Sequence, residues 1–329
     1  MNSCVISQDA PKKERNYQAD NIRFILIVLV VFGHVIETFS GPVKSIIYRI
    51  IYSFHMPAFL FLSGCFAHFS PKKMLKRLVF PYVVFQVIYL QFEGLLNPEN
   101  LVLIQFTTPF HLLWYLFALI VYYFSIPALD VSSRRSMLLI VGIGCLCSVL
   151  IGRDMNVGYF LSLSRIVVFF PFFIGGYYCR KIGLQSIQGV FQKRKKECLA
   201  ILVVLIAALE FYFAKTNTPA KAFYGAFSYY KEKENGDMLT RILFLCCALF
   251  WIVFLFLAVP NKQIPVISKM GSNTMAVYLL HGLVRMVLLK FEVLHYSEGI
   301  NFLLAAGIVA AIMVLLNTRW VTTLFRKLF

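Results

Sequence analysis

The stretch ADNIRFILIVLVVFGHV, residues 19–35, establishes the fold class. After Asp20 and Arg23 it is apolar as far as His34. It belongs to an apolar run over 21–38, and a membrane-spanning helix needs about 20 mostly apolar residues. No small-residue cleavage pattern of a signal peptide follows the run. We therefore expect a retained first membrane span.

Runs of similar length and composition recur along the chain, and we expect ten spans. They lie at 21–38, 46–69, 78–96, 111–130, 136–152, 159–179, 198–214, 240–259, 270–290 and 300–318. The composition agrees, because 60% of the residues are hydrophobic and 14% are charged, against about 45–50% and about 25% in a soluble domain. The sequence thus predicts an all-α polytopic membrane protein and excludes a disordered chain, a disulfide-rich secreted domain and a water-soluble enzyme.

The net charge of +17 indicates membrane topology rather than nucleic-acid binding. Most of the 32 Lys and Arg residues lie in the tails and in one set of alternate loops, and such loops face the cytoplasm. We therefore expect two cytoplasmic tails, at 1–20 and 319–329, around a ten-helix domain at 21–318. The eight cysteines form no pair of C-x-x-C units, so no metal site is expected.

Two long loops have a distinctive composition. The outer loop 215–239 is rich in Tyr and Phe, and we expect it along the outer membrane interface. The inner loop 180–197 is basic, and we expect it to hold anionic lipid headgroups.

Ionisable groups at membrane depth are costly and mark function by default. On an α-helix, Arg23 and His34 lie about 20° apart around the axis and about 16 Å apart along it. Asp20 falls within about 40° of His34 and can pair with Arg23. For Asp20 and Arg23 the simpler alternative is an interfacial ion pair. For His34 we favour function, because a buried imidazole needs partners and titrates near neutral pH.

The second and ninth spans add histidines at similar depth. His55 precedes Pro57, which should bend its helix, so His55 either lines a cavity or bonds a backbone carbonyl at a packing kink. His281 shares a face with Arg285 and could be a polar contact between helices. Asn273 could be a helix N-cap.

Polar groups at both membrane surfaces complete a possible axis through the bundle. Trp114 opens the fourth span and is typical of an aromatic belt, whereas Arg165 in the sixth span needs a partner or water. An anionic cofactor could dock on the inner basic cluster at 72–77 and reach up to an imidazole, where a hydroxyl acceptor would arrive from outside. The histidine would act as general base for that hydroxyl or carry the acyl group itself.

Several motifs, spread over most of the chain, together resemble one family. They are ADNIR at 19–23, VFGH at 31–34, YSFHMPAF at 52–59, LSG at 62–64, RLVFPY at 77–82, LWYL at 113–116, FFPFFIG at 169–175 and GSNTMAVYLLH at 271–281. In this order they resemble the integral-membrane acyltransferase family three, especially its fucose 4-O-acetylase-like branch, whose members modify bacterial surface glycans.

The resemblance implies a ten-helix bundle that transfers an acyl group, usually acetyl, from cytoplasmic acyl-CoA to an extracytoplasmic sugar. It implies functional roles for Arg23 and His34, with the histidine catalytic. The family has an R-x-x-R element for CoA phosphates at the start of the third helix. This chain has Lys73-x-x-Lys76 beside Arg77, and lysine meets phosphate as a point charge without bidentate geometry.

We therefore expect an O-acetyltransferase of the bacterial plasma membrane that uses acetyl-CoA and a carbohydrate acceptor. The expected site residues are a catalytic group of His34, Arg23 and Asp20, a CoA group of Lys73, Lys76, Arg77, Ser63 and Asn273, and an acceptor group of His55, Trp114, Arg165, Tyr278 and His281. Some relatives carry an acid in the stretch around His55, which leaves its role open. The alternatives are a secondary transporter, against which the lack of an inverted repeat and the cationic inner mouth argue, and a non-catalytic subunit of a polysaccharide assembly complex.

Overall fold

The computed structural model describes residues 15–99, 105–158, 160–183, 194–230 and 236–329. Within these ranges the chain forms helices and no strands, which confirms the predicted all-α class. The helices are α1 Tyr17–Ile36, α2 Pro42–Phe66, α3 Pro71–Met74, the π-helical turn η1 Leu75–Val79, α4 Phe80–Leu96, α5 Trp114–Leu129, α6 Arg134–Leu150, α7 Leu163–Ile182, α9 Lys195–Lys215, α10 Met238–Ala258, α11 Pro265–Gly271, α12 Thr274–Lys290, α13 Glu298–Leu316 and α14 Arg319–Leu328. Short 3-10 turns are η2 His111–Leu113, η3 Ile151–Arg153, η4 Phe160–Ser162 and η5 Ala220–Phe223.

Nine segments of the described chain are helices long and apolar enough to cross a membrane, and a bent pair forms a tenth candidate. The bent pair is α11 and α12, whose axes differ by 75°, so the prediction of one continuous helix over 270–290 is wrong. Gly271 ends α11 directly against α1, where an added Cβ would lie 1.8 Å from the carbonyl oxygen of Asp20. The chain turns at this contact before α12 begins.

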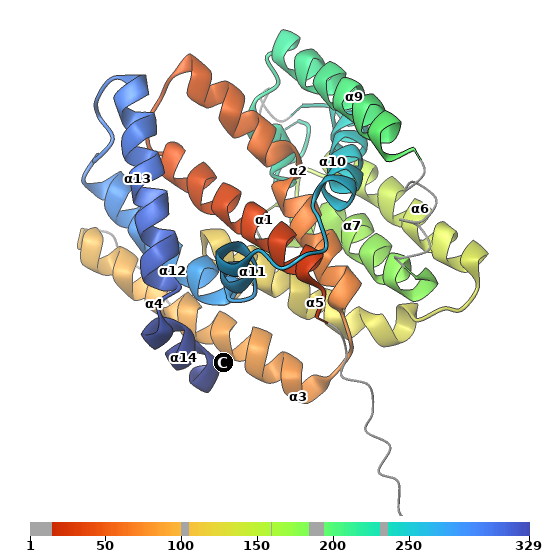
Figure 1. The fold of residues 1–329 in the computed structure, drawn as a ribbon, viewed down its shortest axis with the longest axis horizontal. Helices are drawn as coiled ribbons and strands as arrows, with labels where there is room; N and C mark the ends of the chain where they lie inside the picture. Colours follow the sequence, from red (N-terminus) through yellow and green to blue (C-terminus); the bar gives the residue numbers. More distant parts are fainter. Residues whose placement is uncertain (1–14, 100–104, 159, 184–193, 231–235) are drawn as a thin grey trace, which may run out of the picture.

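Helix α1 lies near the middle of the bundle, with α12 and α13 on one side and α6 and α9 towards the other (Figure 1). It packs against α2, α11, α12 and α13. The helix begins before the expected residue 21, because the side chain of Asn16 caps it by accepting a hydrogen bond from the backbone N–H of Ala19. Because α1 is central, the residues after Arg23 contact several helices that carry the other sequence motifs.

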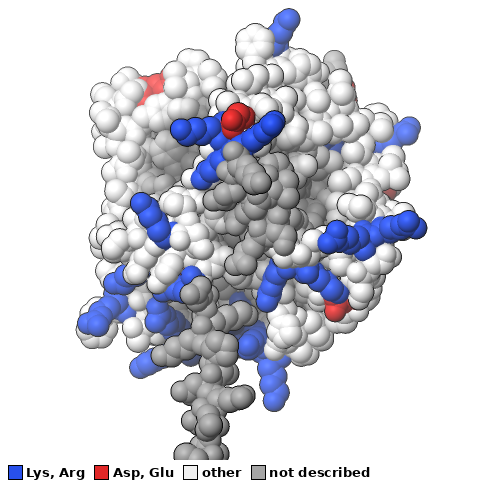
Figure 2. All heavy atoms as spheres, turned by 45° about the vertical axis from the view of Figure 1, so that its right-hand side comes forward, with Lys and Arg blue, Asp and Glu red and all other residues white. Residues whose placement is uncertain are grey.

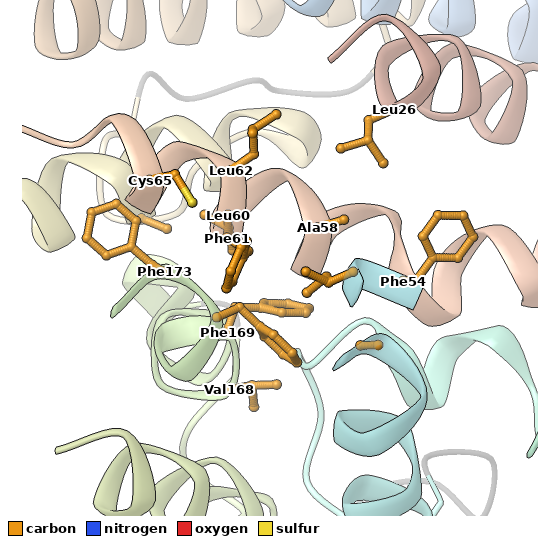
Figure 3. Packing of buried hydrophobic residues seen from close by; sticks show 14 of the residues in the cluster. Leu26, Phe54, Ala58, Leu60, Phe61, Leu62, Cys65, Val168, Phe169 and Phe173 are labelled. Carbon is orange, nitrogen blue, oxygen red and sulfur yellow. The ribbon is translucent and has the colours of Figure 1, made fainter. Parts of the chain in front are cut away.

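Helices α2 and α7 pack closely through two glycines. A Cβ on Gly64 would lie 2.0 Å from the carbonyl oxygen of Phe173, and a Cβ on Gly176 would lie 2.0 Å from that of Phe61. Only glycine permits this backbone approach. Around it, aromatic side chains fill the space, and Figure 3 shows Phe61 of α2 facing Phe169 of α7.

Two segments expected outside the spans are helical. The third span begins at α3 and continues through η1 into α4, so the basic residues 72–77 lie on the first turns of a helix. The expected tail 319–329 contains α14, whose Phe325 and Phe329 pack against Phe85 of α4. Burial of these rings explains why the tail is held on the bundle.

Part of the aromatic loop after α9 packs into the molecule. Phe223, at the end of η5, is 2% exposed, and the hydroxyl groups of Tyr224 and Tyr48 lie 2.5 Å apart. Residues 184–193 of the basic loop 180–197 lie outside the described residues.

Candidate active site

A cavity of about 780 Å³ runs through the bundle beside α1. Arg23 lines it near the start of α1, and His34 and Glu37 line it at the helix end. We name these two ends of the bundle the Arg23 end and the Glu37 end. Helices α2, α5, α7 and α12 contribute most of the other walls. One face of α1 therefore connects the two ends of a single cavity.

His34 belongs to a network of polar side chains at the Glu37 end. Its Nδ1 lies 3.3 Å from Oε2 of Glu37, the residue directly after the end of α1. Arg285 of α12 donates its Nε–H to the same oxygen at 2.9 Å. The hydroxyl of Tyr52 lies 3.4 Å from Nδ1 of His34. A neutral His34 that donates Nδ1–H to Glu37 presents Nε2 as a proton acceptor.

The other two mid-depth histidines bond their own helices. His55 Nδ1 donates to the carbonyl of Ile51 at 2.6 Å, and His281 Nδ1 donates to that of Val277 at 2.8 Å. His55 also lines the cavity, so both alternatives considered for it hold together. The ring centroid of His281 lies 5.5 Å from that of His34, and its buried Nε2 has no hydrogen-bond partner among the described residues.

At the Arg23 end, an acid holds the arginine in place. Arg23 donates to Oδ1 of Asp20 at 2.9 Å, so the expected ion pair is present, and Arg15 donates to Oδ2 at 2.8 Å. Asp20 is 5% exposed and does not line the cavity. Further along the wall, the hydroxyl groups of Ser63 and Tyr115 lie 2.8 Å apart.

Besides His55, three of the residues expected to receive an acceptor share the cavity wall. Arg165 lies over the ring of Trp114, 5.2 Å from the ring centroid, which is a cation–π distance. Tyr278 donates its hydroxyl to the carbonyl of Leu112 at 2.6 Å and also faces the cavity. These motifs come from α5, α7 and α12, so the bundle brings together residues far apart in the sequence.

One family of known proteins matches most of the chain. A family described as an acyltransferase domain, acyltransferase family 3, matches residues 16–318. The chain belongs to acyltransferase family 3. No curated protein and no solved structure matches the chain. The protein is therefore a multi-pass membrane acyltransferase, and membership favours an enzyme over the transporter and the non-catalytic subunit.

Part of the expected CoA group in this acyltransferase lies outside the cavity. Lys73, Lys76 and Arg77 are exposed on α3 and η1, although Leu78, the next residue, lines the cavity. Figure 2 shows a face of the molecule on which Lys and Arg far outnumber Asp and Glu. The basic cluster is thus next to the cavity wall and open to a ligand from outside the bundle.

Asn273 has a structural setting in the acyltransferase. It lies at the break between α11 and α12, donates to the carbonyl of Lys269 at 2.9 Å and accepts a hydrogen bond from Arg326 of α14 at 2.9 Å. It does not line the cavity, and its side chain does not cap α12. His281 does not line the cavity either.

Sequence reasoning missed Glu37 as a site residue. The available signal was its position three residues after His34, which places both side chains on one helix face. Glu37 lies at the end of the predicted span 21–38, where an acid is an ordinary feature of a helix end. Only the packing of α12 against α1 shows that Arg285 reaches the same carboxylate.

Proposed function

We propose that this acyltransferase moves an acetyl group from cytoplasmic acetyl-CoA to a hydroxyl of an extracytoplasmic glycan, as fucose 4-O-acetylase-like proteins do. The proposed setting is the bacterial plasma membrane, with the Arg23 end at the cytoplasm. One observation carries the proposal: a single cavity is lined by Arg23 at one end and by His34 and Glu37 at the other. Donor and acceptor can then meet inside the bundle without either crossing the membrane.

For the donor, we propose that CoA docks from the Arg23 end. Lys73, Lys76 and Arg77 supply positive charges for its phosphates. Arg23, held by Asp20, orients the thioester end of the ligand inside the cavity. Ser63 offers a hydroxyl along the same wall.

For the chemistry, His34 acts as the general base. As the acceptor hydroxyl oxygen attacks the thioester carbonyl carbon, Nε2 of His34 takes the hydroxyl proton. The carbon–sulfur bond then breaks, the CoA thiolate leaves, and the proton passes from His34 to the sulfur. The products are the acetyl ester and free CoA. In the alternative route, His34 attacks the thioester itself and holds the acetyl group before the hydroxyl takes it.

Glu37 is a positioning residue in both routes. Its carboxylate holds Nδ1 of His34 and is itself held by Arg285. A carboxylate that accepts Nδ1–H keeps the imidazole in the tautomer with a basic Nε2, and it stabilises the imidazolium that forms. Trp114, Arg165 and Tyr278 are proposed to contact the glycan from the Glu37 end.

The decisive experiment replaces His34. Purified protein in nanodiscs should release free thiol from acetyl-CoA when a suitable glycan is present, and His34→Ala should lower kcat by about 10²–10⁴-fold because the general base is removed. The fold and CoA binding should remain. His295→Ala is the matched control, because His295 is exposed and lies in the loop between α12 and α13. Normal turnover by His34→Ala would refute the mechanism.

A further inference from the structure

A second cavity lies at the Glu37 end of the bundle. Its volume is about 450 Å³, and it shares Glu37 and Tyr224 with the first cavity. Its remaining walls come from the first turns of α2 and from the chain that follows α9. Lys44, Arg49 and Lys221 supply positive charge to these walls.

Of these cations, Arg49 gives the strongest indication of a binding site. Its side chain lies on the second turn of α2, only 9% of the residue is exposed, and its Nε has no hydrogen-bond partner in the described part of the chain. A buried charge without a full set of partners is costly and marks a function by default. The planar guanidinium matches the geometry of a phosphate or a carboxylate.

The acidic side chain in the wall of the second cavity already has hydrogen-bond partners. Glu37 is the acidic residue among those described as lining the second cavity, and its Oε2 lies within hydrogen-bond reach of both Arg285 and His34. The Lys44 ammonium lies 4.9 Å from the ring centroid of Tyr48, on the same wall. The second cavity therefore presents a net positive charge to an occupant.

The two cavities meet where the chemistry is proposed to occur. Tyr224 lines both of them, and its hydroxyl lies 2.5 Å from that of Tyr48. Glu37 also lines both and contacts His34. An anion in the second cavity would thus lie on the far side of Glu37 and Tyr224 from the main cavity.

We propose that the second cavity binds a negatively charged group of the acceptor, a phosphate or a carboxylate, and that the enzyme thereby selects acidic or phosphate-linked glycans. The inference rests on the proposed function in taking the occupant to be the acceptor. Binding of the anion by Arg49 and Lys44 holds the neighbouring sugar near the Glu37 end of the main cavity. The sugar hydroxyl can then reach His34.

Three probes that share one pyranose ring test the proposal: glucose, glucose 1-phosphate and glucuronate. Their dissociation constants are measured by saturation-transfer NMR on the full chain in phosphatidylcholine nanodiscs, which contain no anionic lipid. At least one charged probe should bind about ten-fold tighter than glucose, as expected for a charge-assisted hydrogen bond. A preference for glucose 1-phosphate identifies a phosphate-linked acceptor, and a preference for glucuronate identifies an acidic sugar.

Variants locate the effect in the second cavity. Arg49→Gln should reduce the advantage of the charged probe to less than about three-fold, and Arg49→Lys should keep more of it because the charge remains. Lys290→Gln is the control, because Lys290 is an exposed cation at the end of α12 and lines neither cavity. CoA binding should be equal in all variants, which shows that the fold is intact.

Equal binding of the three probes, no binding of any probe, or an unchanged preference in Arg49→Gln would each overturn the inference. Acetyl-CoA turnover is measured separately on the same samples. If the charged probe is preferred through Arg49 but no glycan supports release of CoA, the proposed function fails while the anion site stands. If turnover occurs on neutral glycans without any charge preference, the function stands and the anion site fails.

Discussion

A single carboxylate organises the polar residues at the Glu37 end. Oε2 of Glu37 lies 3.3 Å from Nδ1 of His34 and 2.9 Å from Nε of Arg285. The arginine balances the charge of the carboxylate, and the carboxylate orients the imidazole. His34 is thus part of a three-residue arrangement drawn from α1, the residue after it, and α12.

Replacement of Glu37 tests this arrangement. Glu37→Gln should lower kcat by about 10²-fold, because His34 loses the acceptor that fixes its tautomer, whereas KM for acetyl-CoA should change little. Glu37→Asp keeps the charge and should recover part of the rate. Steady-state release of CoA gives both parameters, and Glu93→Gln, whose carboxylate accepts from Asn97 at the end of α4, is the matched control. A change confined to KM would contradict a positioning role.

The basic cluster is tested through the donor alone. Lys76→Ala combined with Arg77→Ala should raise the Kd for CoA by about ten-fold, because two charges that meet phosphate are lost. Isothermal titration in nanodiscs measures it. The matched pair Arg134→Ala and Arg135→Ala, exposed on the first turn of α6, should leave the Kd as it is. An unchanged Kd in the first pair would rule out this docking site.

At the scale of helices, close contacts between backbones position the site. The α2–α7 pair approaches through Gly64 and Gly176, and α11 ends on α1 through Gly271. In lipid, such packing replaces the hydrophobic driving force that holds helices together in water. The first contact holds the wall that carries Ser63, and the second turns the chain so that α12 brings Arg285 to Glu37.

A methyl group at the first contact should destabilise the bundle. In Gly176→Ala the new Cβ would lie 2.0 Å from the carbonyl oxygen of Phe61, so backbone must move. We expect a loss of about 1–3 kcal/mol in the free energy of unfolding, read as a lower Tm in detergent. Gly142→Ala on α6 is the control: its Cβ meets nothing within 4 Å, and its Tm should stay the same or rise. Equal Tm values for the two variants would contradict the close contact.

At the scale of the whole molecule, the cavity defines a donor end and an acceptor end. The distribution of Lys and Arg predicts that the Arg23 end faces the cytoplasm. The exposed residues Arg134 and Lys290 stand at the start of α6 and at the end of α12, positions that the predicted topology places on opposite sides of the membrane.

Sided labelling tests this orientation. In a variant without native cysteines, Arg134→Cys should react with a membrane-impermeant maleimide only after the cells are opened, and Lys290→Cys should react in intact cells. The extent of labelling is read on gels. Reversed labelling would place the basic cluster outside and would remove the basis for cytoplasmic CoA, whereas labelling of both from outside would contradict the topology.

The membrane-spanning class and the approximate spans follow from the order of amino acids alone. The reason is that apolar length and hydrogen bonding within a helix are local properties. The periodicity of α1 likewise places Arg23 and His34 on one face, and both line the same cavity. The predicted span 270–290 contains Gly271, Ser272 and Asn273, which are residue types common in turns. The contact of Gly271 with α1, where the chain turns, depends on tertiary packing and has no local signal.

The partners of each polar side chain depend on how helices rotate and pack against one another. Arg285 and His281 lie four residues apart on α12. In the bundle Arg285 reaches Glu37, whereas His281 is buried and does not line the cavity. No local feature of the sequence indicates that Lys44 and Arg49 line one cavity together with the chain after α9. Such contacts join residues distant in the sequence through side-chain packing, so they exist only once the bundle has assembled.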